Sequence, residues 1–405
     1  LTPPQPGDDG ERWLAYGNQL YRTRQYDKSV AAFDTAIAKG KELTGNYGKA
    51  LSLGESKKYK LAEIAIARAI ASVPASQRAN YYYFWKYQSA IFEALKNYEN
   101  ALKAINTAIE LEPNDPILRN EKANVLFTSK KYSEAIAIYT ELIWTKPEAY
   151  VYYNLGTIRY STGKTQEAIS DFDRAIAINP QWALAYLSRS GAKLALGNNQ
   201  GAISDSELAI AINPQLAGAY TNRGSAKSAL GNNQEAISDF DRAIAINPQV
   251  AEAYYNRGGA KYALGKKQEA ISDFDKAIAI NPQLAAAYVN RGLAKSDLGN
   301  NQGAISDYDR AIAINPQFAE AYVNRGIAKY ALGNKQGAIS DFDRAIAINP
   351  QFAKAYVGRG GVKSAIGDKQ GAIADLSKGA ELFRQQGQTD LYQKVIGLIA
   401  QLKGS

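Results

Sequence analysis

The sequence lacks three residue types altogether: its 405 residues include no cysteine, no methionine and no histidine. Without cysteine, the chain can form neither a disulfide nor a thiolate metal site. Without histidine and cysteine, it also lacks the commonest general bases, nucleophiles and metal ligands of enzymes. No GxxxxGK[ST] phosphate-binding loop occurs either. These absences predict a protein that is not an enzyme and that holds no cofactor and no metal.

Long apolar runs and strongly charged segments are also missing. No stretch approaches the roughly 20 apolar residues that a membrane span requires. The net charge of +9 at pH 7 is distributed along the chain and is not gathered in a basic arm. Charge of this kind favours solubility more than nucleic-acid binding. We therefore expect neither a membrane span nor a nucleic-acid partner.

The absence of methionine includes the initiator, because the sequence begins at Leu1. Two interpretations are open: a trimmed or partial chain, and a mature exported protein whose signal peptide has been removed. Loss of the oxidisable residues cysteine and methionine suits an exposed location. We favour export to an extracellular, periplasmic or lumenal site, with a cytoplasmic protein as the alternative.

What the sequence does contain is a repeat. An Asn-Pro pair returns every 34 residues between residues 179 and 350. A fixed period of this length is the signature of a solenoid, in which one small unit is stacked many times. The pairs are Asn179-Pro180, Asn213-Pro214, Asn247-Pro248, Asn281-Pro282, Asn315-Pro316 and Asn349-Pro350.

Residues 251–284 show what one unit contains. Apolar and small residues recur with helical spacing in two stretches. Gly265 separates the stretches, and glycine after a helix commonly adopts the left-handed conformation that ends it. Pro282 has no backbone N–H and cannot continue the second helix. Each unit is therefore predicted to be a helix, a tight turn, a second helix and a short link.

The packing of such units can be anticipated from residue size. Gly258 should lie where two helices cross, because a small residue lets helix backbones approach closely. We expect Tyr254, Leu264 and Phe274 to fill the space between neighbouring helix pairs. One pair cannot bury this surface alone, so stacking is what should stabilise the chain.

The unit resembles the tetratricopeptide repeat (TPR), a helix–turn–helix motif of 34 residues. Its wider pattern, AYxNRGxAKxxLGxxQxAISDFDxAIAINP, is similar to repeats of bacterial, notably cyanobacterial, members of the TPR family. Arg257 and Lys261 depart from the family, which often has leucine and an aromatic residue at these positions. The resemblance implies an all-α fold, a TPR solenoid wound into a right-handed superhelix. It is carried by Tyr254, Gly258, Ala270, Phe274, Ala277 and Pro282.

The regularity of the repeat changes along the chain, which divides into four predicted parts. Residues 1–10 form a Pro-rich N-terminal tail that we expect to be extended or mobile. Residues 11–148 hold four degenerate TPR-like repeats, and residues 149–386 hold seven regular ones. Residues 388–403 form a C-terminal capping helix.

Charged residues also recur with the repeat. Arg257 lies on the face of the first helix that the TPR family packs against neighbours. We expect its guanidinium to pair with an aspartate of a second helix, because a buried arginine is generally paired; ligand binding is the alternative.

Asp273 and Asp275 recur as a pair, but residues two apart on a helix point in different directions. They are therefore predicted to form a charge ladder and not an acid–base site. The equivalents of Arg257 are Arg189, Arg223, Arg291, Arg325 and Arg359.

Comparison of the units with one another shows where the chain varies. Packing positions hardly change, whereas positions that line a concave, peptide-binding groove in the TPR family do change. Tyrosine supplies contact area at low entropic cost, and a side-chain amide both donates and accepts hydrogen bonds. The alternative is that these tyrosines only cover an exposed helix face while the asparagines hold solvent. The resemblance implies these groove candidates: Tyr153, Asn154, Tyr160, Asn222, Tyr255, Asn256, Tyr262, Asn290, Asn324 and Tyr330.

The leading functional prediction is a non-enzymatic scaffold for protein–protein interaction that binds extended peptide segments. The alternative is a secreted structural solenoid whose copies assemble end to end into a homo-oligomer, filament or fibre. One apolar stripe of the closing helix, which includes Leu398, suffices to seal the last repeat; assembly would use a second stripe that stays exposed, and the alternative is an ordinary broad-faced cap. Contact between unlike ends would propagate. The assembly candidates are Trp13, Leu14, Leu20, Tyr392, Ile396 and Ile399.

Overall fold

The computed structural model describes residues 2–404, and every regular element in that range is a helix. The predicted all-α fold class is confirmed. Two compact units are formed, Leu1–Ser188 (unit 1) and Arg189–Ser405 (unit 2). The division between them falls inside α11 (Ala183–Ala195).

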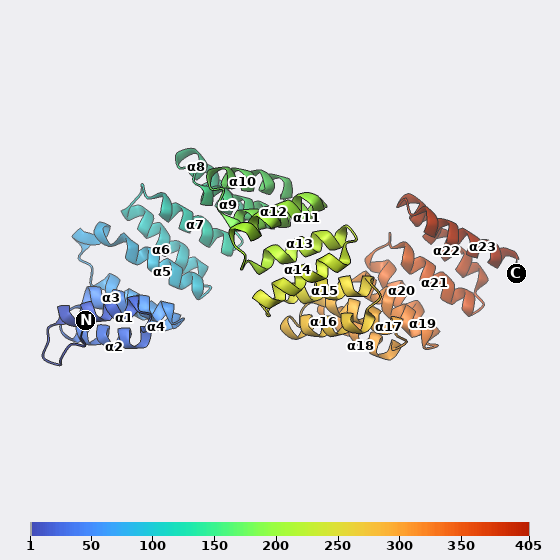
Figure 1. Ribbon diagram of the computed structural model, residues 1–405, viewed down its shortest axis with the longest axis horizontal. Coiled ribbons are helices and arrows are strands. Elements are labelled where there is room, and N and C mark those ends of the chain that lie inside the picture. The colour runs from blue at the N-terminus through green and yellow to red at the C-terminus, as the bar shows by residue number, and fades with distance from the viewer. Residues whose placement is uncertain (1, 405) are drawn as a thin grey trace. The chain divides into compact units, whose positions relative to one another are not determined.

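Unit 1 contains ten complete α-helices and one short 3-10 helix in its described part (Figure 1). They are α1 (Gly10–Arg22), α2 (Tyr26–Ala38), α3 (Glu42–Glu55), α4 (Tyr59–Ala71), η1 (Ala75–Tyr81), α5 (Tyr82–Ala94), α6 (Tyr98–Leu111), α7 (Pro116–Thr128), α8 (Tyr132–Thr145), α9 (Ala149–Ser161) and α10 (Thr165–Ile178).

Unit 2 contains twelve further complete helices up to residue 404. They are α12 (Asn199–Ile212), α13 (Ala217–Ala229), α14 (Asn233–Ile246), α15 (Ala251–Ala263), α16 (Lys267–Ile280), α17 (Ala285–Asp297), α18 (Asn301–Ile314), α19 (Ala319–Ala331), α20 (Lys335–Ile348), α21 (Ala353–Ala365), α22 (Lys369–Gln385) and α23 (Thr389–Gly404).

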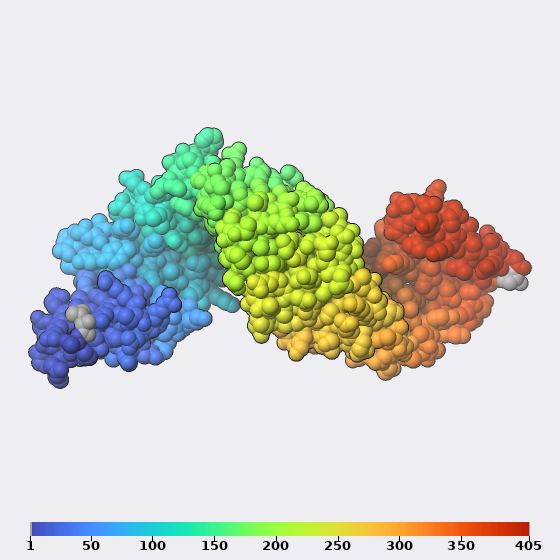
Figure 2. Space-filling view, in the orientation of Figure 1, coloured from blue at the N-terminus to red at the C-terminus, as the bar shows by residue number. Residues whose placement is uncertain are grey.

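Helices that follow one another in the chain pack against each other within each unit, from α1 to α10 and from α12 to α23. In unit 2 the odd-numbered helices from α13 to α21, which open each pair, also touch the next odd-numbered helix along. The green-to-yellow part of unit 2 is one continuous packed surface in the space-filling view (Figure 2). The helices that open the pairs therefore lie side by side on one face of the stack, which we call the first-helix face.

The turn inside each pair requires a left-handed backbone. Gly265, with φ +76°, occupies this position after α15, and glycine fills it in the other regular repeats. In unit 1 the same position after α5 is held by Lys96, with φ +58°. A side chain makes this conformation costly by about 1–2 kcal/mol. The degenerate repeats of unit 1 therefore carry backbone strain that the regular repeats avoid. Arg24, Lys57 and Lys130 share the conformation of Lys96.

The two helices of a regular pair interlock through glycine and an aromatic ring. A Cβ atom added at Gly258 would stand 2.8 Å from Phe274 Cε1 and 3.2 Å from Ala270 O. Phe274 itself is buried, so the predicted close crossing at Gly258 is confirmed. Leu264, which we expected to fill the space between pairs, is instead 42% exposed. It forms the C-cap of α15, at the edge of the stack, where no further helix covers it.

One repeat, formed by α11 and α12, departs from this interlock. Ser206 stands where Phe240 and Phe274 stand in the next two repeats, and Ser190 replaces the glycine. The two Oγ atoms lie 2.8 Å apart, and Ser190 Oγ donates to Ala202 O at 2.9 Å. Both serines are fully buried. In this repeat a hydrogen bond between two serine hydroxyl groups thus replaces the packing of a phenylalanine ring against glycine.

Arginine side chains join the second helices of adjacent repeats. Arg257 Nε and Nη2 donate to the carboxylate of Asp273, in its own repeat, at 2.9 and 2.5 Å. Arg257 Nη1 donates to Asp241, in the preceding repeat, at 2.5 Å. The guanidinium lies 5.4 Å from the centre of the Tyr254 ring, and Lys261 Nζ approaches Asp273 to 2.9 Å. The predicted arginine–aspartate pairing is confirmed, and we call the recurring contact the arginine ladder.

The arginine ladder runs through unit 2. Burial by itself would lower the pKa of Arg257, but hydrogen bonds to Asp273 and Asp241 raise it overall, so the guanidinium stays charged. Asp273 and Asp275 face different arginines, as their spacing predicts, because Asp275 accepts from Arg291 of the next repeat. The pairs within a repeat are Arg189–Asp205, Arg223–Asp239, Arg257–Asp273, Arg291–Asp307, Arg325–Asp341 and Arg359–Asp375. The pairs between repeats are Arg257–Asp241, Arg291–Asp275, Arg325–Asp309 and Arg359–Asp343.

The segment before α1 lies partly against the first helix pair of unit 1. Pro4 is buried, and Lys39 Nζ of the turn after α2 donates to Pro6 O at 3.0 Å. Gly10, the last residue of the predicted tail, already begins α1 and is buried. Asp9 caps this helix by accepting a hydrogen bond from the backbone N–H of Arg12 at 2.9 Å. These contacts tie the segment before α1 to the first helix pair.

A pair of adjacent glycines tests the interlock. We expect Gly258→Ala to lower the free energy of unfolding by about 1–2 kcal/mol, because the new methyl group meets the Phe274 ring. Gly259→Ala should raise it by up to about 1 kcal/mol, because open space surrounds that position and alanine favours a helix. Chemical denaturation of both variants measures the difference. Two effects of the same sign would contradict the packing role of Gly258.

The serine pair allows a double-mutant test. Ser206→Phe alone should cost about 1–3 kcal/mol, because the ring collides with the Ser190 side chain. The combination Ser190→Gly/Ser206→Phe recreates the packing of the next repeat and should exceed the parent in stability, since a buried phenyl ring contributes about 2–3 kcal/mol. Thermal and chemical denaturation of the two single variants and the double variant give the coupling energy. Additive effects would show that the two positions do not compensate each other.

Candidate functional site

Three of the predicted groove residues line one cavity on the first-helix face of unit 2. The cavity has a volume of about 210 Å³ and opens among α13, α15 and α17. Tyr255 and Asn256 come from α15, and Asn290 comes from α17. Ser225 and Ser228 of α13 complete its polar lining. Tyrosine, amide and hydroxyl groups from three successive repeats are therefore gathered at one place.

Hydrogen bonds between repeats hold these side chains in position. Asn290 Nδ2 donates to Tyr255 OH at 3.2 Å, and Asn256 Nδ2 donates to Ser225 Oγ at 3.1 Å. Burial raises the pKa of Tyr255, with a smaller opposing effect of the hydrogen bond from Asn290. The phenol is therefore protonated at neutral pH and can donate a hydrogen bond of its own. Asn256 and Asn290, which we predicted to line a peptide groove, thus already use amide N–H groups to tie one repeat to the next.

Tyr262 lies about two turns beyond Tyr255 along α15. Its hydroxyl donates to Asp297 Oδ2 of the next repeat at 2.6 Å. Burial and this hydrogen bond raise the pKa of Tyr262 to about 12. Lys267 Nζ lies 3.3 Å from the same aspartate. The ring of Tyr262 is thus fixed beside an ion pair at the rim of the first-helix face.

The remaining groove candidates do not share this cavity. In unit 1, Asn154 Nδ2 donates to Asn120 Oδ1 at 3.2 Å, and the ring of Tyr153 packs 4.6 Å from that of Trp182. Tyr160 of the same unit is exposed. In unit 2, Asn222 and Asn324 are half-buried and Tyr330 is exposed.

The exposure expected of the assembly candidates is corrected in part. Ile399 of α23 is only 7% exposed, because it packs with Val395 against Phe383 of α22. Leu398, which we assigned to the sealing stripe, is 46% exposed, so α23 is rotated about its axis relative to our expectation. Tyr392 packs on the same core, and Ile396 is 39% exposed.

The first repeat offers less apolar surface than we expected. Leu20 is buried against the rest of its pair and cannot form part of a surface. Trp13 and Leu14 are half-buried, and the Trp13 ring meets that of Tyr16 edge-on at 6.4 Å. The N-terminal assembly surface is therefore limited to partly covered side chains.

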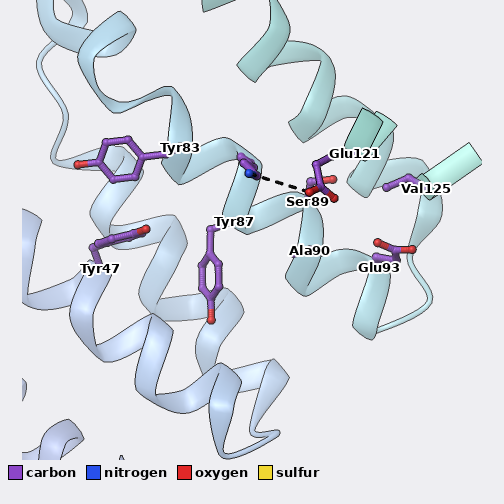
Figure 3. Close-up of a pocket in the computed structure, with 9 residues that line it drawn as sticks. Tyr47, Tyr83, Tyr87, Ser89, Ala90, Glu93, Glu121 and Val125 are labelled. Atoms are coloured by element: carbon purple, nitrogen blue, oxygen red, sulfur yellow. Dashed lines mark ion pairs between the residues drawn. The ribbon is translucent and has the colours of Figure 1, made fainter. Parts of the chain in front are cut away.

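A second cavity, which we did not predict, lies in unit 1. Its volume is about 270 Å³, and its lining comes from the opening helices of three successive repeats, α3, α5 and α7 (Figure 3). Tyr47, Tyr83 and Tyr87 form its aromatic side, and Glu93 and Glu121 lie at the other side. The aromatic run at residues 81–87 is the signal in the sequence that could have identified it.

Two kinds of site are absent from the part of the chain that the structure describes. Residues 2–404 contain no group of three or more acidic side chains placed so that they could hold a metal ion. Within the same residues, none of the helices combines the length and the apolar character needed to cross a bilayer.

Comparison with known families identifies the repeats. Models described as "Tetratricopeptide repeat" match residues 149–181, 221–285 and 319–352. The model "TPR repeat" matches residues 292–333, and "YpiA-like, tetratricopeptide repeats" matches residues 94–146. These matches lie in both units, and they agree with the stacked helix pairs. The chain belongs to the tetratricopeptide-repeat proteins, and its fold is a TPR solenoid.

Curated relatives match part of the chain. It is 28% identical over 180 residues to the Hsp70-Hsp90 organizing protein of Triticum aestivum, and the matched segment covers 42% of this chain and 29% of that protein. It is 26% identical over 187 residues to the protein O-mannosyl-transferase TMTC1 of Homo sapiens, which covers 44% of this chain and 20% of the relative. The chain thus spans less than a third of the length of these relatives.

A solved structure shares the fold over nearly the whole chain. The APC/C hetero-tetramer Cut9-Hcn1 aligns with 95% of this chain and 96% of its own, at 13% identity and a TM-score of 0.53. At this identity the likeness concerns the fold alone. A role in protein–protein interaction is consistent with the family and with the Hsp70-Hsp90 organizing protein.

Proposed function

We propose that this protein is a non-catalytic scaffold that binds an extended peptide segment of a partner protein along the first-helix face of unit 2. The observation that carries the proposal is the cavity in which Tyr255, Asn256 and Asn290 meet. Its side chains come from three repeats, so an extended segment that crosses the opening helices would contact all of them. Polar groups already held in position reduce the entropic cost of binding.

The partner segment we propose is uncharged at its point of contact. The cations that the opening helices carry in each repeat are engaged inside the stack, since Arg257 and Lys261 both pair with Asp273. A clamp for a C-terminal carboxylate needs such cations on the groove surface. Tyrosine rings and amide oxygens instead suit apolar side chains and the backbone N–H groups of a peptide.

The relatives support a scaffold in general terms. The Hsp70-Hsp90 organizing protein is named for organising two other proteins, and a role in bringing proteins together is what we propose for this chain. The relative named as a transferase matches over 20% of its length, and we propose no catalytic role here.

End-to-end self-assembly is the second candidate function. It is favoured by the exposure of Ile396 and Leu398 on α23, the last helix of the stack. Burial of Ile399 and Leu20 removes two of the side chains on which that contact would depend. We therefore prefer peptide binding, for which the side chains are already assembled.

The groove can be tested with peptides selected on the parent protein from a displayed library of random sequences. We expect the affinity for these peptides to fall at least about tenfold, or about 1.4 kcal/mol, in the triple variant Tyr255→Ala/Asn256→Ala/Tyr262→Ala. The reason is that contact area and aligned polar groups are lost. Fluorescence anisotropy with labelled peptides measures the dissociation constants, and circular dichroism checks that helicity is retained.

Ser272→Ala/Lys276→Ala is the matched control, because it changes two exposed side chains of the neighbouring helix α16. Binding to this variant should equal binding to the parent. If every selected peptide binds the triple variant as tightly as the parent, the groove in unit 2 is not the binding surface.

A further inference from the structure

The aromatic cavity of unit 1 has a chemistry that differs from the groove of unit 2. It lies among α3, α5 and α7, and its volume is about 270 Å³. Three tyrosine rings line one side, and the charged residues of the lining are two glutamates and one lysine (Figure 3). Binding at this cavity does not depend on peptide binding by unit 2, because the two sites share no residue.

The three rings meet at steep angles and do not form a stack. The Tyr47 ring centre lies 5.3 Å from that of Tyr83 at 72°, and 6.1 Å from that of Tyr87 at 79°. Tyr47 is held in place by stacking on the buried Phe84 at 4.4 Å and 18°. Tyr87 OH donates to Ala50 O at 3.3 Å, which fixes the third ring. Rings at these angles can contact one compact group from more than one side.

The phenol groups add no negative charge at neutral pH. Burial raises the pKa of Tyr47 to about 12. Burial is also the main cause that raises the pKa of Tyr83 and Tyr87. The rings therefore stay neutral and present the electron-rich faces that attract cations.

Carboxylates outnumber cations in the lining of this cavity. Lys86 Nζ lies 4.0 Å from Glu121 Oε1, at the limit of an ion pair, and both side chains are more than a third exposed. Glu93 accepts a hydrogen bond from Thr128 Oγ1 at 2.8 Å. Among residues 2–404, no lysine or arginine forms an ion pair with Glu93. The lining thus carries two carboxylates and one ammonium group.

We propose that this cavity binds a basic side chain, an arginine in preference to a lysine, from a partner protein. The planar guanidinium can lie against a tyrosine ring and donate two hydrogen bonds to one carboxylate, which the lysine ammonium cannot do in the same way. Glu93 and Glu121 provide carboxylates on the side opposite the rings. An acidic side chain would instead meet both glutamates, with Lys86 alone to offset them.

The proposal can be tested with three short peptides that differ only at a central residue, which is arginine, its uncharged analogue citrulline, or glutamate. Isothermal titration calorimetry of each peptide with the full chain gives the affinities. The arginine peptide should bind at least about tenfold more tightly than the citrulline peptide, because only the charged form gains the cation–π and carboxylate contacts. The glutamate peptide should bind more weakly than both.

Variants of the cavity locate the binding. The affinity for the arginine peptide should fall at least about tenfold in the variant Glu93→Gln/Glu121→Gln and severalfold in Tyr83→Leu. Glu99→Gln/Glu110→Gln removes the same charge from the exposed side of α6 in the same unit and should leave the affinity unchanged. Circular dichroism checks the fold of each variant.

Four results would overturn the proposal. They are no measurable binding of the arginine peptide at millimolar concentration, equal binding of the arginine and citrulline peptides, tighter binding of the glutamate peptide, and unchanged binding to the Glu93→Gln/Glu121→Gln variant. The third would show that Lys86 selects acidic partners. None of these results bears on the Tyr255 groove, which the triple variant of unit 2 tests separately.

Discussion

A half-buried arginine that binds two carboxylates at once makes the interaction on which the regular stack of unit 2 depends. Asp273 is 3% exposed, and its charge would be costly to bury without the guanidinium of Arg257 and the ammonium of Lys261 beside it. Because Arg257 also reaches Asp241 of the preceding repeat, the same contact satisfies one repeat and joins it to its neighbour. The pairing therefore specifies both the register within a pair and the register between pairs.

The arginine ladder also determines what the first-helix face can offer a partner. Its recurring arginines and lysines are paired with aspartates of the second helices, so the cavity at Tyr255 presents tyrosine, asparagine and serine. The cavity of unit 1 combines tyrosine rings with Glu93 and Glu121. We infer that one chain carries two binding surfaces of different chemistry, one for an uncharged segment and one for a basic side chain.

The architecture could be predicted from the sequence because the period and the turn glycines recur in each regular unit, and the Gly258–Phe274 pairing recurs in several of them. Burial at the ends could not be predicted. Whether Ile399 or Leu398 faces α22 depends on the rotation of α23 about its axis, which no neighbouring repeat specifies. The unit 1 cavity depends on the space left among three helices, which a linear pattern does not show. Export of the chain and its division into four parts stay predictions.

The buried half of the arginine ladder, which pairs the two helices within a repeat, contributes more to stability than the exposed half, which joins adjacent repeats. Chemical denaturation of Asp273→Asn and Asp275→Asn tests this directly, because the two variants remove equal charge two residues apart. Asp273→Asn should lower the free energy of unfolding by about 3–5 kcal/mol, since it leaves Arg257 and Lys261 without their buried partner. The Asp275 side chain is 55% exposed, and its loss should cost at most about 1 kcal/mol. Equal losses of stability in the two variants would contradict the account.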